Sequence, residues 1–395
     1  MPVPAFPAPL PSPQNPAGAE GDTLAQRANH WLDTLVETAN RLLELPLTVL
    51  LLAIGLVAGL AALWLHRRHR RGKPVGLLRF ALILCVGAAA TLVVDQKIAV
   101  LQDGVANLRA QTRASLTAML QLRGGEAAAR RTPLFDEARA RRELGDALGT
   151  VELTALIQDD ATDLVQLTAA EPPLAALLAI VDLHCPGVGI EIGATLADKT
   201  MTSAFARRTG ATVAINGEAG NSGRPGCGLG RWQGFLLRRG ERLLAEQPGN
   251  PRPFLWFDAE NRARYVAATA GDRALPAGAW NAIWGRVDAL VGGAPSTEEF
   301  RSRQPRTAMA IDADGGRLFL LVVDGRQERS FGMTRPEVGQ VLAAFGAHDG
   351  MLCDEGGSAC MFLKLFGGIA NVPSDRLGQE RPTYTHFGIT FAGGR

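Results

Sequence analysis

The sequence has few cysteines and histidines for its length, and neither residue is grouped as metal ligands usually are. Five cysteines and six histidines occur among 395 residues. There is no Cys-x-x-Cys pair, so a structural zinc site is not expected. The four distal cysteines allow three disulfide pairings, and the sequence does not choose among the pairings of Cys185, Cys227, Cys353 and Cys360.

A strong net charge is also absent. The formal net charge is +2, which gives no overall attraction to polyanions, so we expect no nucleic-acid partner. Glycine (45 residues) and proline (23 residues) are plentiful, as in loop-rich β or α/β domains. A chain of 395 residues holds one large domain or two ordinary ones.

The first 95 residues are predicted to form a tail and a membrane anchor. Residues 1–21 are rich in proline and are expected to be disordered. Residues 22–95 combine an amphipathic helix with two apolar runs, at about 46–65 and 75–94, each long enough to span a bilayer as a helix. The alternative, a buried helical hairpin, explains the basic loop between the two runs less well.

The basic loop predicts the orientation of this anchor. Residues 66–73 contain five Arg and Lys residues, and the positive-inside rule assigns such a loop to the cytoplasm. The sequence therefore predicts a bacterial inner-membrane protein whose partner is the lipid bilayer. Both termini and residues 179–395 are expected to be periplasmic.

Residues 96–178 are predicted to be a helical stalk or linker between the membrane and a folded domain. Helical spacing continues through residues 95–122, and residues 136–148 and 151–157 are also predicted to be helical. The sequence leaves open whether this segment folds independently.

The apolar period changes near residue 179, where we expect a folded domain that extends to residue 395. The predicted fold class is a periplasmic α+β or mixed α/β domain, in which one mixed sheet packs with helices, preceded by the α-helical two-span membrane hairpin. The expected elements are strands over 179–183, 189–192, 211–215 and 235–237, a helix over 202–208 that stops at Gly210, and a helix over 279–290.

Local turn and capping signals are clearer in the last ninety residues. Two β-rich runs within 307–323 flank the sequence Asp314-Gly315, which predicts a β-hairpin. Thr334 and Glu337 have the spacing of a capping box, with a proline in the first turn, and predict a helix that ends before Gly346. A last strand is expected over 386–391.

The segment Met351–Met361 carries the clearest chemical signal. An apolar run is followed by Asp354 and Glu355 and then by Gly-Gly-Ser, which predicts a strand that ends in a glycine-permitted turn. Adjacent residues on a strand face opposite ways, so both carboxylates serve one site only if the turn begins at Asp354. The alternative is an ordinary turn that carries acidic residues.

Seven motifs in a constant order give this segment a wider context. They are Val-Asp-Leu at 181–183, Thr-Ser-Ala-Phe-Ala at 202–206, Ala-Ile-Asn-Gly at 214–217, Pro-Arg-Thr-Ala at 305–308, Val-Asp-Gly-Arg at 323–326, Ser-Phe-Gly-Met-Thr at 330–334 and Asp-Glu-Gly-Gly-Ser at 354–358. With these motifs, residues from about 179 to 395 resemble the phosphodiester glycosidase family. Residues 1–178 lie outside the resemblance.

The resemblance implies an enzyme that cleaves the bond between a sugar C1 and a phosphate oxygen. Two positions depart from the family pattern. Glu218 follows Gly217 where the family usually has a second glycine, and Glu355 stands where the family usually has the first glycine after the aspartate. Both changes add a carboxylate, which implies an altered substrate or altered chemistry.

The matching motifs also imply roles for individual residues. Asp354 is expected to lie nearest the anomeric carbon, as nucleophile or as base for water, with Glu355 assisting. Asp324 is the third catalytic candidate and orients an arginine or binds sugar hydroxyls. Substrate-binding candidates are Asn216, Gly217, Arg306, Arg326, Ser330, Gly332, Met333, Thr334, Gly356, Gly357 and Ser358.

Two of these assignments rest on residue chemistry as well as on the resemblance. Arginine forks suit a phosphate, and Arg306 and Arg326 are the candidates. The N-terminus of the helix that begins at Thr334 suits an anion. Each residue also has a plain structural alternative, such as a cap, a turn or a solvated strand end.

The sequence therefore supports two hypotheses and a weaker third. The first is a membrane-anchored glycosidase-type hydrolase acting on a glycosyl phosphodiester or a related envelope glycan. The second is a non-catalytic membrane-tethered module that binds glycan or acts as a scaffold. The third is a metal-assisted hydrolase that uses Asp354, Glu355, Asp324 and Glu218, but no ligand spacing indicates a divalent cation, and no cofactor is expected. Convergence of Asp354 and Glu355 with an arginine in one pocket favours the enzyme.

Overall fold

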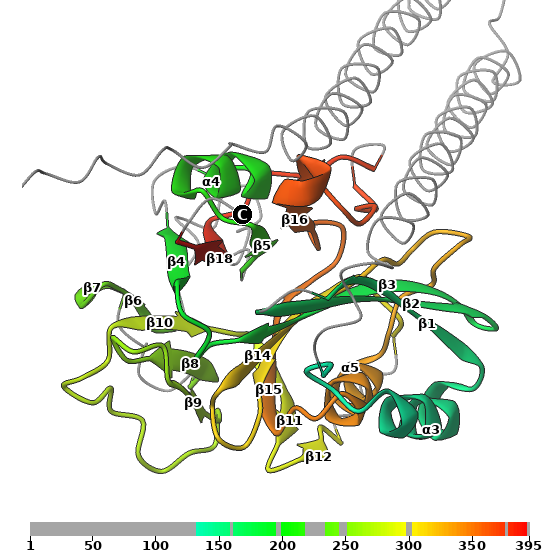
Figure 1. Ribbon diagram of the computed structural model, residues 1–395, viewed down its shortest axis with the longest axis horizontal. Coiled ribbons are helices and arrows are strands. Elements are labelled where there is room, and N and C mark those ends of the chain that lie inside the picture. The colour runs from blue at the N-terminus through cyan, green and yellow to red at the C-terminus, as the bar shows by residue number, and fades with distance from the viewer. Residues whose placement is uncertain are drawn as a thin grey trace, which may run out of the picture.

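The computed structural model describes residues 132–158, 161–194, 199–217, 234–244, 251–297, 302–375 and 378–392, and strands predominate in them (Figure 1). The helices are α3 (Glu137–Leu148), α4 (Thr202–Thr209), α5 (Arg335–Ala344) and a 3-10 turn at Lys364–Phe366. Every strand pair in the described residues is antiparallel, and the strands form three sheets.

The largest sheet has eight strands. In spatial order they are β1 (Val151–Gln158), β2 (Thr162–Ala170), β3 (Pro173–Asp182), β14 (Arg317–Val323), β13 (Arg306–Ile311), β15 (Asp349–Glu355), β11 (Val287–Val291) and β12 (Ala294–Pro295).

Two five-stranded sheets pack with it. One has the order β7 (Glu241–Leu244), β6 (Leu236–Arg238), β10 (Asn281–Trp284), β8 (Phe254–Phe257) and β9 (Ala263–Val266). The other has the order β17 (Gly368–Ile369), β16 (Met361–Leu363), β5 (Val213–Asn216), β18 (Thr385–Phe391) and β4 (Val188–Ala194).

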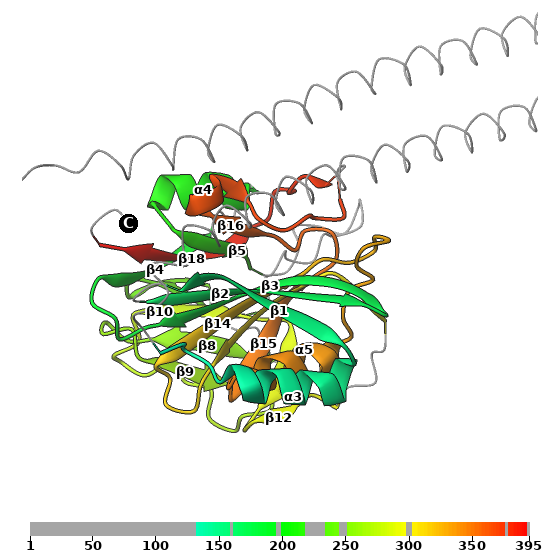
Figure 2. The same cartoon turned by 45° about the vertical axis from the view of Figure 1, so that its right-hand side comes forward.

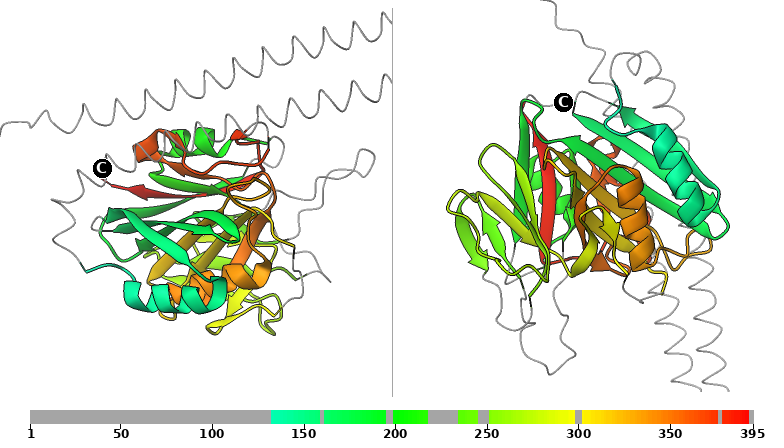
Figure 3. Two further views of the ribbon diagram at one scale, coloured as in Figure 1. Left: turned by 90° about the vertical axis from the view of Figure 1, so that its right-hand side faces the viewer. Right: turned by 90° about the horizontal axis from the view of Figure 1, so that it is seen from below.

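Both faces of the eight-stranded sheet are buried, as the alternation along β3 shows. Ala179 and Val181 belong to the core shared with the five-stranded sheets, whereas Leu178 and Ile180 belong to the core beneath α3 and α5. Figures 2 and 3 show these two helices side by side on the outer face. Their layer is joined by the rings of Phe135 and Phe345, whose centroids are 4.9 Å apart.

The other side of the molecule is closed by α4. This helix lies over the sheet that contains β5 and β16 (Figure 2) and packs Phe205 and Ala206 against it. Gly210 ends α4 with a φ of 74° and a backbone hydrogen bond to Ala206, as its glycine predicts.

The crossing from β15 to β16 contains the predicted carboxylate turn. Strand β15 belongs to the eight-stranded sheet, whereas β16 pairs with β5 in a five-stranded sheet. In the register of β13 with β15, Thr307 lies opposite Asp354, and a bulge leaves Cys353 without an opposite residue. The end of β15 therefore lies at the seam between two sheets, next to the end of β5.

The predicted fold class is wrong, because the described residues are mostly β-strand rather than an α+β or mixed α/β domain with one mixed sheet. Two helices expected from the sequence are strands instead. Residues 151–157 form β1, and residues 279–290 contain β10 and most of β11. Short apolar runs fit a buried strand as well as a helix, and pairing with distant strands decides between them.

The local predictions in the domain are confirmed. The hairpin of β13 and β14 forms around Asp314 and Gly315, and α5 begins with the expected capping box of Thr334 and Glu337. The expected strands over 179–183, 189–192, 211–215, 235–237 and 386–391 correspond to β3, β4, β5, β6 and β18.

The predictions for residues 1–131 lie outside the described residues. They cover the proline-rich tail, the amphipathic helix, the two spans at about 46–65 and 75–94 and the basic loop, so the periplasmic location stays a prediction. In the part that the structure describes, no helix is long and apolar enough to cross a membrane. The helical stalk predicted for 96–178 differs from residue 151 onward, where the chain forms β1, β2 and β3 of the large sheet.

Because both faces of the large sheet are buried, a cavity in it should lower the free energy of unfolding substantially. Leu320 is fully buried in β14, so Leu320→Ala should lower the free energy of unfolding by about 2–5 kcal/mol. Val291→Ala in β11 is the control, because Val291 is 43% exposed, and it should change stability by less than about 0.5 kcal/mol. Urea unfolding of the full-length protein measures both; equal effects would contradict the described core.

Candidate active site

Asp354 lies almost fully buried near the end of β15, with an exposure of 1%. Its Oδ2 accepts hydrogen bonds from the Asn216 amide, at 2.7 Å, and from the Ser358 hydroxyl. Its Oδ1 accepts the backbone N–H of Glu355 at 2.9 Å. Three donors therefore fix both carboxylate oxygens, which accounts for how a carboxylate is tolerated at this depth.

Asn216, at the end of β5, holds the two sheets together at this point. Its Oδ1 accepts hydrogen bonds from the Thr307 hydroxyl at 2.8 Å and from the backbone N–H of Cys360 at 3.0 Å. Its amide nitrogen reaches Asp354. Because β5 and β15 end here and β13 begins here, this side chain joins β5 to two strands that lie more than ninety residues further along the sequence.

The turn after β15 is built on two glycines. Gly356 has a φ of 109°, which favours glycine, and its N–H donates to the carbonyl of Pro305 at 2.9 Å. At Gly357 a Cβ would lie 1.9 Å from Oδ1 of Asp375, so only glycine fits beside that carboxylate. The turn then presents Ser358, which is fully buried, to Asp354.

Two arginines lie at this turn. Arg381 donates to the Ser358 hydroxyl at 2.9 Å and pairs with Asp375 at 3.0 Å. Arg326 is exposed, donates to the Gln304 side chain at 2.8 Å, and has a guanidinium nitrogen 3.4 Å from the position of a Cβ on Gly356. Arg326 was predicted from its motif.

Three residues of this site are absent from the sequence predictions, although one of them, Thr307, lies in the motif Pro-Arg-Thr-Ala at 305–308. Arg381, Asp375 and Thr307 were not predicted as site residues. Arg381 and Asp375 lie in an irregular segment, and Arg381 stands in no motif that separates it from the other basic residues.

Glu355 points away from Asp354 and into a cluster of arginines. It accepts hydrogen bonds from Arg306 and from Arg335, the latter at 2.6 and 3.1 Å, and Arg286 lies 3.8 Å away. Arg306 is fully buried and also donates to the carbonyls of Met333 and Ser302, at 3.0 and 2.9 Å. Arg306 thus fastens β13 to neighbouring loops.

The charges of this cluster shift the ionisation of its members. Burial raises the pKa of Glu355, but the hydrogen bond of Arg335 and the charges of Arg306, Arg335 and Arg286 outweigh it and lower the pKa below its ordinary value. Burial lowers the pKa of Arg306 to about 10, against the opposing charge of Glu355. Glu355 is therefore an ionised structural partner at neutral pH.

Asp324, the third catalytic candidate, has a separate set of partners. Its carboxylate accepts hydrogen bonds from the Asn371 amide at 3.0 Å, from the N–H of Val372 at 2.9 Å and from Arg329 at 2.9 Å. Asn371 in turn binds the backbone of Met361 in β16. Asp324 thus fixes the loop that follows β17 and pairs with Arg329, while its catalytic role stays a prediction.

The candidates over 330–334 secure the start of α5. The Ser330 hydroxyl donates to the carbonyl of Asp324 at 2.7 Å. Gly332 packs against the backbone of Gln304 with a φ of 95°, and the buried Met333 exchanges backbone hydrogen bonds with Gln304. Thr334 caps α5. None of these four residues makes a described side-chain contact with Asp354.

The remaining sequence predictions concern Gly217, Glu218 and a possible metal site. Gly217 packs beside Thr385, where a Cβ would lie 2.4 Å from the hydroxyl, and Glu218 lies outside the described residues. Asp354, Glu355 and Asp324 do not share a ligand-like arrangement, and no group of His, Cys, Asp or Glu among the described residues could hold a metal ion. Among the described residues, Asp354 and Glu355 do not converge with an arginine, which is the arrangement that would favour the enzyme over the non-catalytic module, but Arg381 reaches Asp354 through Ser358.

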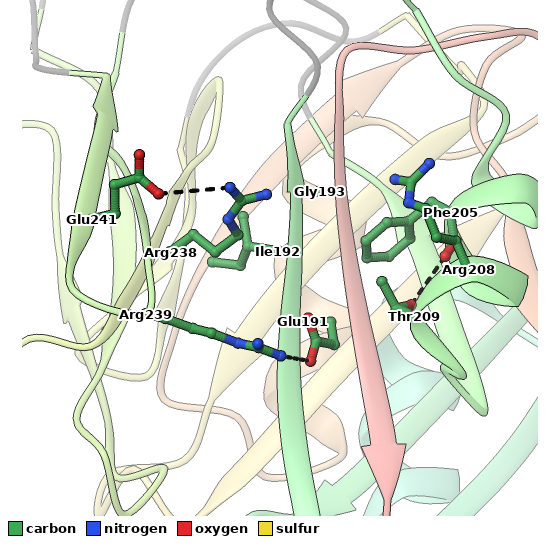
Figure 4. A pocket seen from close by; sticks show the side chains of 9 residues that line it. All are labelled: Glu191, Ile192, Gly193, Phe205, Arg208, Thr209, Arg238, Arg239 and Glu241. Carbon is green, nitrogen blue, oxygen red and sulfur yellow. Dashed lines mark hydrogen bonds and ion pairs between the residues drawn. The ribbon is translucent and has the colours of Figure 1, made fainter.

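A cavity of about 530 Å³ lies elsewhere, between β4, α4 and the turn from β6 to β7 (Figure 4). Its glutamates are occupied by arginines, Glu191 by Arg239 and Glu241 by Arg238. None of the predicted site residues lines this cavity. The hydrogen-bond network of Asp354 therefore identifies the candidate site better than this cavity does.

Part of the chain matches the model of a known protein family. Residues 209–390 match the model of the phosphodiester glycosidase family, which confirms the resemblance inferred from the motifs. This range includes Asn216, Thr307, Asp354, Ser358 and Arg381. The match supports a glycosidase-type hydrolase. A search of curated proteins found no match.

Solved structures also resemble the chain. The catalytic domain of zebrafish N-acetylglucosamine-1-phosphodiester alpha-N-acetylglucosaminidase, auto-inhibited by its pro-peptide, is 18% identical with a TM-score of 0.44, over 61% of this chain and 82% of that one. A hypothetical protein from Synechocystis is 12% identical with a TM-score of 0.41, over 61% of this chain and 63% of that one.

The lowered pKa of Glu355 predicts a pH-dependent contribution to stability. A carboxylate whose folded pKa is depressed stabilises the fold above its ordinary value, 4.5, and loses this contribution as pH falls through the folded value. Glu355→Gln should therefore lower the free energy of unfolding by about 3–5 kcal/mol at pH 7, because Arg306 is left buried without its carboxylate partner. The difference from wild type should shrink below pH 4.5.

Urea unfolding of the full-length protein at several pH values measures this difference. Glu241→Gln is the matched control, because the Glu241 side chain is 69% exposed and its arginine pair is loose at 3.7 Å. A constant difference across pH, or none at pH 7, would rule out the stabilising role of Glu355.

Proposed function

We propose that this protein is a glycosidase-type hydrolase that cleaves a glycosyl phosphodiester or a related envelope glycan, with Asp354 as the key carboxylate. The observation that carries the proposal is the hydrogen-bond network of Asp354, Asn216 and Ser358 at a glycine turn. All three lie within the segment that matches the phosphodiester glycosidase family.

The leaving group decides what such a site must do. A phosphomonoester leaves as a stable anion, so a strong general acid is less necessary than for an ordinary glycoside. The harder tasks are to activate water and to stabilise the positive charge that develops at the anomeric carbon. A carboxylate suits both tasks, and Asp354 is the buried acid at the turn.

The contacts of Asp354 support a route for the proton. Ser358 already donates to Asp354 Oδ2, so a water that attacks the anomeric carbon gives its proton to the Ser358 oxygen while Ser358 passes its own proton to Asp354. The bond from water oxygen to carbon forms, and the bond from carbon to phosphate oxygen breaks with its electron pair on the phosphate. Asn216 keeps Asp354 in position for this transfer.

The second candidate function is a non-catalytic glycan-binding or scaffold module. It is favoured by the low exposure of Asp354, 1%, and by the commitment of Glu355 to arginines instead of to a shared site. On this reading the network only joins two sheets. The two functions differ in one outcome, which is whether Asp354 is needed for turnover or only for stability.

Replacing the carboxylate of Asp354 tests the proposal. Asp354→Asn should lower kcat by roughly 100-fold or more on any sugar-1-phosphodiester that the full-length protein hydrolyses, because the amide cannot accept the proton. Asp349→Asn is the matched control on the same strand, since Asp349 pairs with His348 and contacts the turn at Gly292. The assay is repeated with a chelator.

Three outcomes separate the readings. Unchanged turnover in a folded Asp354→Asn protein would contradict the assigned role. Turnover lost with the chelator in wild type would favour the metal-assisted reading. Glycan binding by the wild type without turnover of any phosphodiester or glycan in the panel would favour the non-catalytic module.

A further inference from the structure

The cavity between β4, α4 and the turn from β6 to β7 has no part in the proposed reaction. Its volume of about 530 Å³ is within the range of small-molecule sites. The large apolar side chains in its wall, Ile192 and Phe205, are only 2% and 0% exposed. The side chains that a ligand meets there are therefore mainly charged, which favours a polar ligand.

The charges of the cavity do not cancel. Three arginines and two glutamates line it, which leaves one positive charge in excess. The arginines are Arg208, Arg238 and Arg239, and the glutamates are Glu191 and Glu241 (Figure 4). A carboxylate, with a single negative charge, matches this excess better than a phosphate monoester, which carries about −1.5 to −2 at pH 7.

Two of the arginines are available to a ligand. No described residue forms a hydrogen bond or ion pair with the guanidinium of Arg208, which is exposed. Arg238 lies 3.7 Å from Glu241, and their side chains are 41% and 69% exposed, so this ion pair is weak and opens at little cost. The two arginines come from different elements, Arg208 from α4 and Arg238 from β6 (Figure 4).

The third arginine fixes the shape of the cavity. Arg239 has a φ of 51°, and Gly240 follows with a φ of 79°, so the β6–β7 turn is of the kind that two-residue hairpins favour. The N–H of Arg239 donates to Oδ1 of Asn281 at 3.0 Å, and its guanidinium pairs with Glu191 on β4 (Figure 4). The turn is thus tied to both β10 and β4, which holds the walls of the cavity in place.

The glutamates decide what else the ligand must carry. A carboxylate accepts hydrogen bonds and donates none, so Glu191 and Glu241 repel a bare anion and suit hydroxyl groups. Guanidinium groups donate to carboxylate and hydroxyl oxygens alike. A ligand that suits both kinds of side chain has one carboxylate and several hydroxyls, which is the composition of a uronic acid.

The cavity lies near the candidate active site but outside it. Gly193 in the cavity wall lies opposite His386 of β18, and His386 lies opposite Asn216 of β5. Neighbouring strands are about 4.8 Å apart, so the backbones of Gly193 and Asn216 are roughly 10 Å apart. Burial lowers the pKa of His386 to about 4, so this side chain is neutral at pH 7 and leaves the charge balance of the cavity unchanged.

We propose that this cavity is a second ligand site, which binds a carboxylated sugar such as a uronic acid residue of an acidic glycan. Arg208 and Arg238 bind the carboxylate of the sugar, and Glu191 accepts hydrogen bonds from its hydroxyls. Glu241, released from Arg238, accepts another. This site does not depend on the reaction proposed for Asp354.

Calorimetric titration of the full-length protein with sodium glucuronate, at constant ionic strength, tests the site. Glucuronate should bind, and Arg208→Gln should weaken the binding at least 10-fold, because the carboxylate loses a guanidinium partner. Arg208→Lys should weaken it less, since lysine keeps the charge but not the fork. Arg207→Gln is the matched control: it removes the same charge from the same helix, and Arg207 contacts Gly367 and Phe362 instead of the cavity.

Two simpler ligands test the proposed composition. Glucose lacks the carboxylate and acetate lacks the hydroxyls, so each should bind at least 10-fold more weakly than glucuronate. Equal affinity for either of them would overturn the assignment. The same holds for a wild type that does not bind glucuronate, and for equal weakening by the Arg207 and Arg208 variants.

The variant Asp354→Asn separates this site from the proposed function. The folded variant should bind glucuronate as the wild type does, whereas binding that is lost in it and kept in Arg208→Gln would place the ligand at the candidate active site and contradict the inference. Glucuronate binding that depends on Arg208 in a protein without turnover would support the cavity site and count only against the proposed function. Turnover that depends on Asp354, without any glucuronate binding, would overturn the cavity site alone.

Discussion

The crossing of the chain from β15 to β16 is the constraint on which the site depends. These strands belong to different sheets, so the five residues between the end of one and the start of the other must turn sharply at the seam. Gly356 supplies the positive φ, and Gly357 allows the backbone to approach Asp375. The hydrogen bond from Asn216 to Asp354 then ties the two sheets together at the same place.

The two carboxylates at the end of β15 have different surroundings. Strand geometry sends neighbouring side chains to opposite faces, and here one faces the seam while the other faces buried arginines. Glu355 fixes the end of the strand through Arg306 and Arg335. The rigidity gained on that side holds the turn, and with it Asp354 and Ser358, in one arrangement. A site positioned in this way needs few contacts of its own to stay ordered.

The features that the sequence predicted correctly are those that neighbouring residues decide. The capping box of α5 joins Thr334 to Glu337, and the hairpin turn joins two strands that follow one another in the sequence. Residues that are close in sequence are therefore enough to predict both features. The strands β1 and β10 were missed because their apolar residues fit two periods and only distant partners select one. Arg381 was missed for a similar reason, since its contact with Ser358 joins residues that are 23 positions apart in the sequence.

The central claim is that the chain breaks the bond between a sugar carbon and a phosphate oxygen, and isotope labelling tests it most directly. Hydrolysis of a sugar-1-phosphodiester in water enriched in oxygen-18 should release a phosphomonoester without the label, because water attacks the carbon. Mass spectrometry of the released phosphomonoester reads the outcome. Label in the phosphate would mean attack at phosphorus and would contradict the account of Asp354 as a glycosidase carboxylate.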